Sequence, residues 1–339
     1  MNVRAQWMVS MCLLAAVPAF AGDARSASAE ERYAKRCQAQ GPSRILDMQG
    51  TMLWGTWSGW TDRDQRKATE QKSVLVSANL DGLARAPEGA KSLRLEGGHL
   101  AGGKSLVGAV LQGTASNGQS TEVAICGEEP ASDDPGMSWY RIQAWNPVAQ
   151  EWSNPCAPAG DVPNPRALAL GGVWDEKGAR RDEAGKITFA CENGVLSKCA
   201  RWGYKPWASR DGRSLADAHQ ACTRMARADY CGNGKSHTRE KTMIEYYDSL
   251  GVSARTTTAT KEWDPARASF EATWAPDGAS CLARTRHQES LEEIQKECPG
   301  RFRKNTVDLG DGDRCAIERS DRTASAGMLR NRVHGGPAR

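Results

Sequence analysis

The stretch SLADAHQACTRMARADYCGNGKSHT, residues 214–238, does most to decide the fold. It opens in the form of a capping box, with Ser214 followed three residues later by Asp217. Apolar side chains then recur at helical spacing, at Leu215, Ala218, Cys222, Met225 and Ala226. Gly232 is suited to end the helix. The pattern predicts an amphipathic helix that carries a cysteine on its apolar face and runs into a glycine-rich turn.

A second helix is predicted further along the chain. It begins at Ser290, and Glu293 follows three residues later, again in the form of a capping box. Its apolar face carries Leu291, Ile294 and Cys298. Pro299-Gly300 stops it. In both helices a cysteine lies on the apolar stripe, where a disulfide to the core would be placed.

The residues before these helices follow a different pattern. Between about 45 and 158 short apolar runs alternate with Gly, Asn and Asp, which predicts an antiparallel sheet, a sandwich or a partial barrel. Representative runs are Met52-Leu53-Trp54, Val74-Leu75-Val76, Leu93-Arg94-Leu95 and Trp139 to Trp145. Two more strands are expected at 168–170 and 187–189, beyond a Pro- and Asp-rich linker or long loop at 155–165.

The first residues have the features of a secretory signal. Arg4 supplies a positive charge, residues 7–20 form an apolar run, and Ala19-Phe20-Ala21 is an A-x-A cleavage site. The run is shorter than the roughly 20 apolar residues that a membrane-spanning helix needs. We therefore predict cleavage after Ala21 and export to the periplasm or the extracellular space. The mature chain would begin at Gly22 and contain no transmembrane segment.

The cysteine count predicts a disulfide framework. Of the 11 cysteines, Cys12 lies in the predicted signal, which leaves an even number and allows up to five bridges. The candidates are Cys37, Cys126, Cys156, Cys191, Cys199, Cys222, Cys231, Cys281, Cys298 and Cys315. Cys222 and Cys231 would lie about 13 Å apart along a straight helix, so they do not pair with each other unless the helix breaks. The nearby candidates for Cys231 are Cys199, Cys281 and Cys298, among which spacing does not choose.

The composition does not suggest a nucleic-acid partner. The formal net charge is +4, and loss of Arg4 with the signal leaves a nearly balanced chain. The 12 tryptophans beside 4 phenylalanines are unusual, because Trp brings a large apolar area with a polar N–H. We expect a core filled by Trp. The alternative is an exposed aromatic surface at Trp54, Trp57 and Trp60, whose spacing of three prevents all of them from sharing one face of a regular strand.

The densest cluster of chemically active side chains runs from His219 to His237. The ligand types of a zinc site are all present, at His219, Cys222, Cys231 and His237. Their spacing matches no common zinc finger, and an oxidising compartment favours disulfides. A Cys231–His237 nucleophile pair is the second interpretation. It would need an unpaired cysteine, whereas the count is even, and the C-terminal end of a helix disfavours a thiolate.

We expect the turn after the first helix to be structural, with no metal and no cofactor. A phosphate-binding loop at 234–236 would need glycine where Asp229 stands. The acidic stretch 308–313 resembles a calcium loop in composition but lacks the EF-hand spacing. We expect Gly232 and Gly234 to form a tight turn, and Asp229 and Thr238 to hydrogen-bond to its backbone.

The segment Ala228-Asp229-Tyr230-Cys231-Gly232 resembles the bacterial ADYC-domain family, which is named for its first four residues. Supporting matches are Phe189-Ala190-Cys191, Lys198-Cys199, Trp202 to Trp207, His219-x-x-Cys222, Phe270-Glu271-Ala272, Pro276 to Cys281 and Cys298-Pro299. The resemblance spans about 165–330. It implies an exported bacterial protein, commonly at the cell envelope, and it supplies no mechanism and no catalytic residue. Many members look lipid-anchored, and this chain, which lacks a lipobox, departs from that.

The expected fold class is α+β, with a β-rich antiparallel N-terminal region and a disulfide-rich C-terminal α+β region. The expected organisation is a signal peptide at 1–21, a flexible leader at 22–44, a β-rich domain at 45–160, an ADYC-like Cys-rich domain at 165–330 and a tail at 331–339.

The leading functional expectation is a non-enzymatic binding module, exported to the envelope or secreted, whose partner is an envelope or extracellular ligand and not nucleic acid. The alternative is a secreted hydrolase that uses the neighbourhood of Asp229, Cys231 and His237. An open cleft lined by these side chains would favour the hydrolase, whereas burial and a disulfide would favour the binding module.

Overall fold

The computed structural model describes most of the chain. The described residues are 21–38, 75–147, 149–156, 162–175, 177–239, 242–321 and 327–334. Nearly all of the predicted signal, the first expected strands up to residue 74, and Trp54, Trp57 and Trp60 lie outside these ranges. The statements made above about those segments stay predictions.

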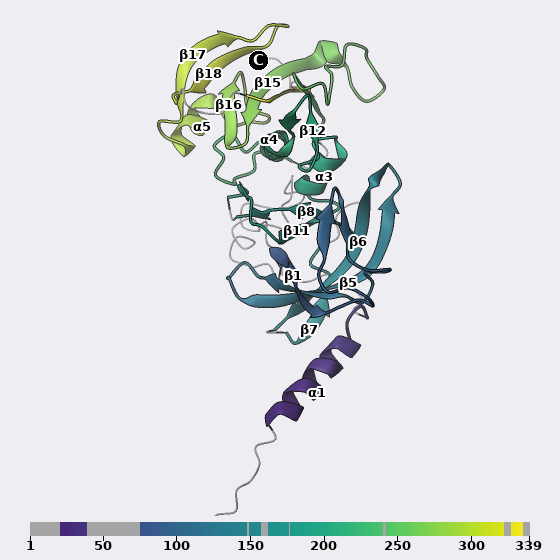
Figure 1. Ribbon diagram of the computed structural model, residues 1–339. Helices are drawn as coiled ribbons and strands as arrows, with labels where there is room; N and C mark the ends of the chain where they lie inside the picture. Colours follow the sequence, from purple (N-terminus) through teal and green to yellow (C-terminus); the bar gives the residue numbers. More distant parts are fainter. Residues whose placement is uncertain are drawn as a thin grey trace, which may run out of the picture. The chain divides into compact units, whose positions relative to one another are not determined.

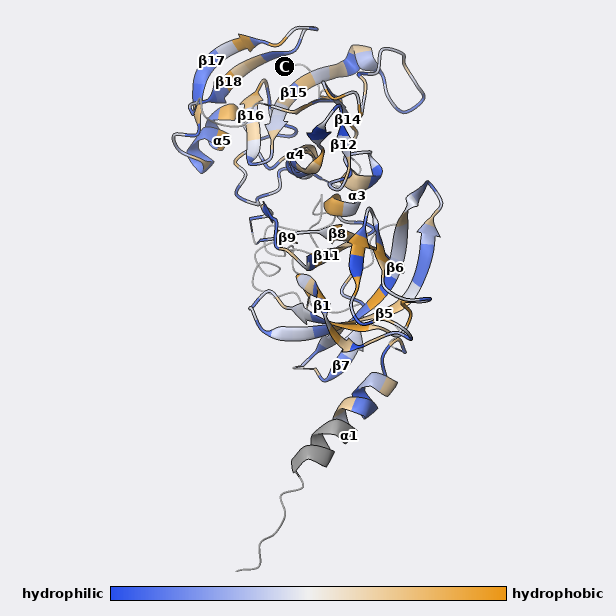
Figure 2. Ribbon diagram, viewed as in Figure 1, coloured by the Kyte–Doolittle hydropathy of each residue, from blue (hydrophilic) through white to orange (hydrophobic). Residues whose placement is uncertain are grey.

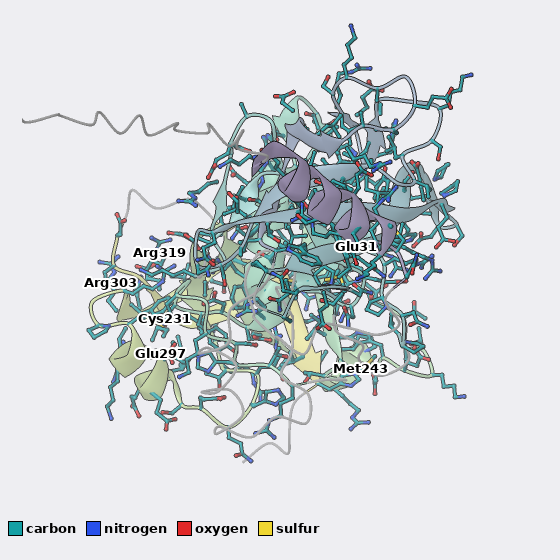
Figure 3. The ribbon with its side chains drawn as sticks, turned by 90° about the horizontal axis from the view of Figure 1, so that it is seen from below. Glu31, Cys231, Met243, Glu297, Arg303 and Arg319 are labelled. Carbon is teal, nitrogen blue, oxygen red and sulfur yellow. A yellow bond between two sulfur atoms is a disulfide. The ribbon has the colours of Figure 1, made fainter. Side chains whose placement is uncertain are left out.

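Helix α1, Ala21–Ala34, belongs to the first of two compact units, which ends at Arg36. Its sequence is rich in Ala, Arg and Glu, which are strong helix formers. Glu31 (Figure 3) and Lys35 add an exposed ion pair of 3.2 Å, one helical turn apart. All but the first residue of this helix lies within the segment 22–44 that was predicted to be a flexible leader.

The second compact unit, Cys37–Arg339, contains an antiparallel barrel (Figure 1). Its strands pair in the order β5-β4-β1-β11-β8-β6-β7, and β5 also pairs with β6. That extra pairing closes the sheet into a ring and leaves β7 outside it. The strands are β1 Ser77–Arg85, β4 Val110–Thr114, β5 Ser120–Ala131, β6 Asp134–Asn146, β7 Glu151–Ser153, β8 Ala167–Gly171 and β11 Lys186–Cys191.

Side-chain alternation along β6 divides the buried residues between two cores. Tyr140, Ile142 and Ala144 pack in the apolar cluster formed by the barrel strands. Met137 and Trp139 point the other way, into a second cluster that contains the helices. Both faces of this strand are therefore covered, which explains its long apolar run.

Two helices, α3 Val195–Arg201 and α4 Ala216–Arg227, connect the barrel to a second sheet. Helix α3 contacts β11, and α4 contacts the strands β15, β16 and β19 described below (Figure 1). A disulfide between Cys199 and Cys222 ties the two helices together. One apolar cluster runs from Ala131 of the barrel through both helices to Leu329 of the second sheet.

The second sheet has the order β14-β19-β15-β16-β18-β17, and its paired strands are antiparallel. Its strands are β14 Ile244–Asp248, β15 Ala268–Ala275, β16 Gly278–Leu282, β17 Phe302–Asp308, β18 Arg314–Arg319 and β19 Leu329–His334. Helix α5, Leu291–Glu297, precedes β17. Because β19 continues to His334, the tail predicted from residue 331 begins too early.

Short elements complete the described chain. They are the strands β2 Arg94–Glu96, β3 His99–Ala101, β9 Val173–Trp174, β10 Arg180–Arg181, β12 Ser209–Arg210 and β13 Arg213–Ser214, and a 3₁₀ turn at Pro265–Arg267. None of the helices in the described part of the chain has the length and apolar character needed to cross a membrane.

The two predicted helices differ in how well their ends were placed. The capping box of α5 is confirmed, because Ser290 and Glu293 bond reciprocally. Helix α4 begins instead after Leu215, and Ser214 accepts only from the N–H of Ala216. It also ends earlier than Gly232, at Arg227, because the next residue turns into the left-handed region.

The disulfide framework is confirmed. The five pairs are Cys37–Cys126, Cys156–Cys191, Cys199–Cys222, Cys231–Cys298 and Cys281–Cys315. Cys222 and Cys231 have different partners, as predicted, although α4 ends at Arg227 and Cys231 lies outside the helix. Of the three candidates for Cys231, the structure selects Cys298, which is the C-cap of α5.

Within the described residues the fold is mostly β, with 42% strand, 14% helix and antiparallel sheets. The division between 45–160 and 165–330 is not followed by the sheets. Strands β8 and β11 lie beyond residue 165 but complete the barrel, because each pairs with earlier strands. The Pro-rich segment is thus a connection between barrel strands and not a boundary between sheets.

Candidate functional site

The turn at 228–238 is held by its own first residues. Ala228 adopts a left-handed conformation, with φ of 51°, and its N–H caps the end of α4. Asp229 is fully buried, and its carboxylate accepts from the backbone N–H groups of Asn233 at 3.1 Å and Gly234 at 3.0 Å. It also pairs with the buried guanidinium of Arg224 at 2.5 Å. This carboxylate is committed to the turn.

Tyr230 anchors the turn in a buried polar network. Its ring stacks on Trp274 with centroids 5.5 Å apart, and its hydroxyl donates to Glu271 at 2.9 Å. The same hydroxyl accepts from the N–H of Arg286 at 2.7 Å. Burial raises the pKa of Tyr230 well above its ordinary value, and the neighbouring Glu271 raises it further. The phenol is therefore a neutral structural donor.

Glu271 is the centre of that network. Its carboxylate accepts from Arg286 Nε at 3.0 Å and Asn331 Nδ2 at 2.7 Å, and Asn331 accepts in turn from the indole N–H of Trp274. The Arg286 guanidinium also donates to two carbonyls at the end of α4. A buried ion pair is tolerated when its remaining polar atoms are hydrogen-bonded, as they are here.

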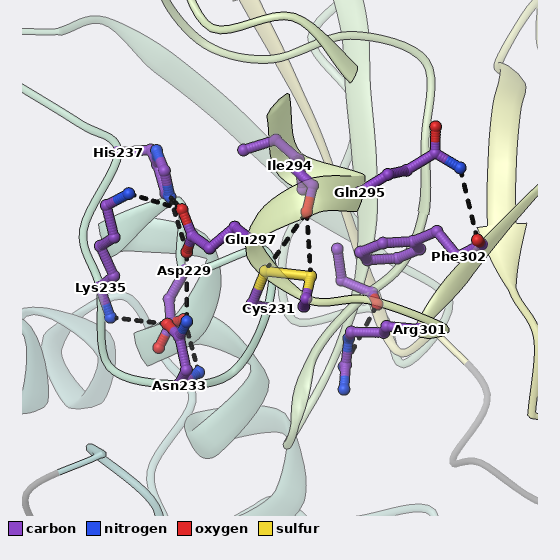
Figure 4. Close-up of a disulfide and its surroundings, with 12 residues drawn as sticks. Asp229, Cys231, Asn233, Lys235, His237, Ile294, Gln295, Glu297, Arg301 and Phe302 are labelled. Carbon is purple, nitrogen blue, oxygen red and sulfur yellow. Dashed lines mark hydrogen bonds and ion pairs between the residues drawn. A yellow bond between two sulfur atoms is a disulfide. The ribbon is translucent and has the colours of Figure 1, made fainter. Parts of the chain in front are cut away.

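Cys231 and Gly232 join the turn to the rest of the sheet. Cys231 is bonded to Cys298, next to the main chain of α5 (Figure 4). Gly232 has φ of 68°, and a Cβ placed on it would lie 1.9 Å from the carbonyl oxygen of Asp277. The N–H of Ala279 donates to the Tyr230 carbonyl at 3.0 Å. The turn at 276–279 is thus packed directly against the motif backbone, which only glycine allows.

His237 closes the turn against α5 (Figure 4). Its imidazole is nearly fully buried and lies 3.5 Å from Glu289 and 3.2 Å from Glu297. Burial lowers the pKa of His237, but the two carboxylates raise it more strongly, to about 8. Burial raises the pKa of Glu297, but His237, Lys235 and Asn233 lower it by more, to about 2. These ion pairs link the turn to α5 and to the residues just before it.

The motif region lacks the free thiol and the Asp–His pair on which the hydrolase hypothesis depended. The sulfur of Cys231 is in a disulfide, and the acids that face His237 are Glu289 and Glu297, not Asp229. The zinc interpretation loses its ligands as well, because Cys222 is bonded to Cys199. Among the described residues no set of three His, Cys, Asp or Glu side chains is arranged to hold a metal ion.

The remaining motif candidates have structural partners. His219 is fully buried, its Nε2 lies 2.9 Å from the Leu196 carbonyl, and burial lowers its pKa to about 4. Lys235, in the segment considered for phosphate, binds Glu297 at 2.6 Å. Thr238 is buried. The acidic stretch 308–313 forms the turn between β17 and β18, where the Asp308 side chain accepts from the Gly310 N–H.

The second sheet carries a groove, with a volume of about 670 Å³. Paired residues place Thr273, Cys281, Glu318 and Arg303 in one row across β15, β16, β18 and β17. Because directly paired residues share a face, this row marks the face opposite to the one that packs on α4. The groove is lined by Thr273, Ser280, Cys281, Arg303, Asn305, Thr306, Val307, Asp308, Leu309, Glu318, Arg319, Asp321 and Gly327.

The polar side chains of the groove are held in fixed pairs. Arg303 Nε and Asn305 Nδ2 both donate to Glu318 Oε1, at 3.1 and 2.7 Å. Arg319 Nη1 donates to both carboxylate oxygens of Asp277 at 2.6 Å. Figure 3 shows Arg303 and Arg319 at one side of the molecule, and Figure 2 shows hydrophilic residues along much of β17. The groove therefore presents ordered hydrogen-bonding groups.

A comparison with known families decides the identity of the motif region. The ADYC domain matches residues 103–288. The chain belongs to the ADYC-domain family. Neither the curated proteins nor the solved structures contain a significant match to the chain.

The ADYC motif has a structural role in this protein. Its four named residues respectively cap a helix, hold the following turn, anchor a polar network and form a disulfide. The groove has a different relation to the family. Only Thr273, Ser280 and Cys281 of its lining fall within the matched residues 103–288. The signature therefore accounts for the fold around α4 and leaves most of the groove unassigned.

Sequence reasoning missed the groove and the buried network. Glu271 was noticed only as part of a family match, and Arg286 and Asn331 gave no signal because they lie far apart in the chain. The groove depends on which strands are neighbours, since β18 lies between β16 and β17. Strand β17 itself shows no period-two alternation, because only Phe302 and Val307 are apolar and the four residues between them are exposed.

Proposed function

We propose that this ADYC-domain protein is an exported, disulfide-stabilised, non-enzymatic binding module of the cell envelope or the extracellular space. The signal features of residues 1–21 and the five disulfides support export, because such bridges persist in oxidising compartments. The groove on the second sheet is proposed as the ligand site.

The groove carries this proposal. A volume of about 670 Å³ is within the range of small-ligand sites. Arg303, Asn305 and Arg319 are held by hydrogen bonds to acidic partners, so a ligand would meet donors that are already oriented. Preorganised groups reduce the entropy that binding costs.

The hydrolase alternative has lost its support. It required an available thiolate at Cys231 beside a general base, and that sulfur is bonded to Cys298. In the groove, the described lining residues Ser280 and Thr273 bond to each other, and no histidine lines the site. A hydroxyl nucleophile with an adjacent imidazole base is therefore not assembled there.

The test is equilibrium dialysis of the oxidised protein against low-molecular-mass fractions of envelope extract and culture medium from the producing cell. The protein is then denatured, and released molecules are identified by mass spectrometry. We expect one ligand class to be retained near one equivalent and to be released chemically unchanged. Asn305→Ala should reduce retention, and Cys231→Ser should not change the chemical form of the ligand.

Two outcomes would contradict the proposal. One is the absence of any molecule enriched above a control dialysis with the reduced, unfolded protein. The other is repeated conversion of the retained molecule into products with a protein-dependent rate, which would return the protein to the enzyme class.

A further inference from the structure

We propose that the groove between β15 and β17 binds an uncharged, hydroxyl-rich saccharide. The inference rests on the proposed function and specifies its ligand. It depends on three properties of the groove: its charges are paired, its hydrogen-bonding capacity is only partly used, and its lining includes apolar side chains.

The charged side chains of the groove are balanced by partners. Arg303 pairs with Glu318 at 2.5 Å, and Arg319 pairs with Asp277 at 2.6 Å and with Asp321 at 3.8 Å. Asp308 pairs with Arg314 at 2.8 Å. A ligand with a strong net charge would have to displace one of these partners or leave it beside a like charge. Charge complementarity therefore favours a neutral ligand over a phosphate, a polyanion or a polycation.

The hydrogen-bonding groups of the groove retain capacity for a ligand. Within the described residues, the Asn305 amide uses one N–H toward Glu318 and its carbonyl oxygen accepts no hydrogen bond. Arg303 uses two of its nitrogens toward the same carboxylate, which leaves further N–H groups of its five. A ligand must accept from Arg303 and both donate to and accept from Asn305. A hydroxyl group does both.

The apolar residues in the groove lining suit the apolar faces of a sugar ring. Val307 and Leu309 line the groove and pack against a small buried cluster that contains Phe270 and the Cys281–Cys315 disulfide. A saccharide presents hydroxyl groups at the edge of each ring and C–H groups on its faces. The combination of polar and apolar side chains in the groove lining matches that division.

A peptide that adds as an extra strand fits less well. Strand β17 is the edge of the sheet, and edge addition needs a regular strand with accessible backbone groups. The register of β17 is interrupted between Lys304 and Val307, and Arg303 and Lys304 are exposed on it. Bulges and exposed basic residues are the features by which proteins block edge pairing. The open face of the sheet is therefore the better site.

The test is binding of the oxidised mature protein to an array that holds neutral, acidic and amino oligosaccharides. Retained glycans are then titrated by isothermal calorimetry, and a peptide array is run in parallel. We expect binding to neutral glycans, weakened about tenfold by Asn305→Ala and at least as much by Arg303→Ala, since tenfold corresponds to the loss of about one good hydrogen bond. Lys304→Ala is the matched control, because Lys304 is exposed on the same strand but does not line the groove.

The outcomes separate this inference from the proposed function. Binding only to acidic glycans, amino glycans or peptides overturns the saccharide assignment and leaves a binding module. Neutral-glycan binding that Arg303→Ala and Asn305→Ala leave unchanged overturns the groove as the site. Absence of binding on both arrays overturns the inference, and when the dialysis experiment also retains nothing, the binding-module function falls as well.

Discussion

Removal of the Cys231–Cys298 disulfide is the perturbation that tests the structure of the motif most directly. The bridge spans 67 residues, and closing a loop of that length lowers the entropy of the unfolded chain by an amount worth about 4 kcal/mol. The overlapping Cys281–Cys315 bridge does not provide a shorter path between the two positions. We therefore expect the double variant Cys231→Ala/Cys298→Ala to lose about 4 kcal/mol of unfolding free energy.

The assay is equilibrium unfolding in urea, followed by tryptophan fluorescence, with the other four bridges kept oxidised. The double variant avoids the exposed partner thiol that a single Cys231→Ser substitution would leave. The matched control is Cys199→Ala/Cys222→Ala, whose bridge spans 23 residues and should cost about 3 kcal/mol. Both losses should appear with the cooperativity of unfolding preserved, because the buried networks remain.

Two results would refute this reasoning. One is a loss below about 1 kcal/mol, which would mean that the bridge does not constrain the unfolded chain as its loop length requires. The other is the reaction of Cys231 with a thiol reagent in the denatured, unreduced protein. A reactive Cys231 would also restore the nucleophile that the hydrolase alternative needs.

Four further predictions concern the motif and the start of the chain. Gly232→Ala should lower the unfolding free energy in urea by more than about 2 kcal/mol, because a left-handed non-glycine residue costs about 1–2 kcal/mol and the new Cβ meets the Asp277 carbonyl. The control Gly300→Ala, where φ is positive and no atom lies within 4 Å of the new Cβ, should show only the backbone cost. Equal losses in the two variants would contradict the contact with Asp277. Tyr230→Phe should lower the free energy of thermal or urea unfolding by about 2–4 kcal/mol, because Glu271 and the N–H of Arg286 each lose a buried partner. The control Tyr246→Phe should be nearly neutral. A similar loss in that control would argue against the network. Burial lowers the pKa of His237 in the folded protein, and two carboxylates raise it, to about 8 from 6.5. Its contribution of about 2 kcal/mol to stability is therefore complete below pH 6.5 and is lost as the pH rises through 8. His237→Gln should remove this pH dependence from the unfolding free energy measured from pH 6 to 9, and an unchanged pH dependence would show that another group causes it. N-terminal sequencing of protein from the producing cell should begin at Gly22, and recovery of full-length chain alone would refute export.

Local patterns predicted the elements whose determinants lie close together in the chain. The capping box of α5 was read from Ser290 and Glu293, since both of its bonds connect residues three apart. Short apolar runs separated by Gly, Asn and Asp predicted strands of the barrel, and the even cysteine count predicted the disulfides. These signals need no knowledge of the tertiary fold.

Features that depend on strand order could not be predicted in the same way. Closure of the barrel requires β8 and β11 to pair with strands on the other side of a Pro-rich segment, which composition alone marked as a linker. The start of α4 was misplaced for a related reason. Ser214 belongs to β13, which forms a local hairpin with β12, and this pairing outweighed its propensity to cap a helix. Arg303 and Thr273 share a groove only because two strands lie between theirs.

The position of the ADYC motif explains why membership of the family does not name a ligand. All four motif residues are buried, and their polar atoms are used inside the fold, so selection on them acts through stability. The groove is connected to the motif through one residue, Asp277. The Asp277 backbone packs on Gly232, and the Asp277 carboxylate holds Arg319 at the groove. The motif can thus hold one wall of the groove in position, while the exposed residues of β17 lie outside its contacts.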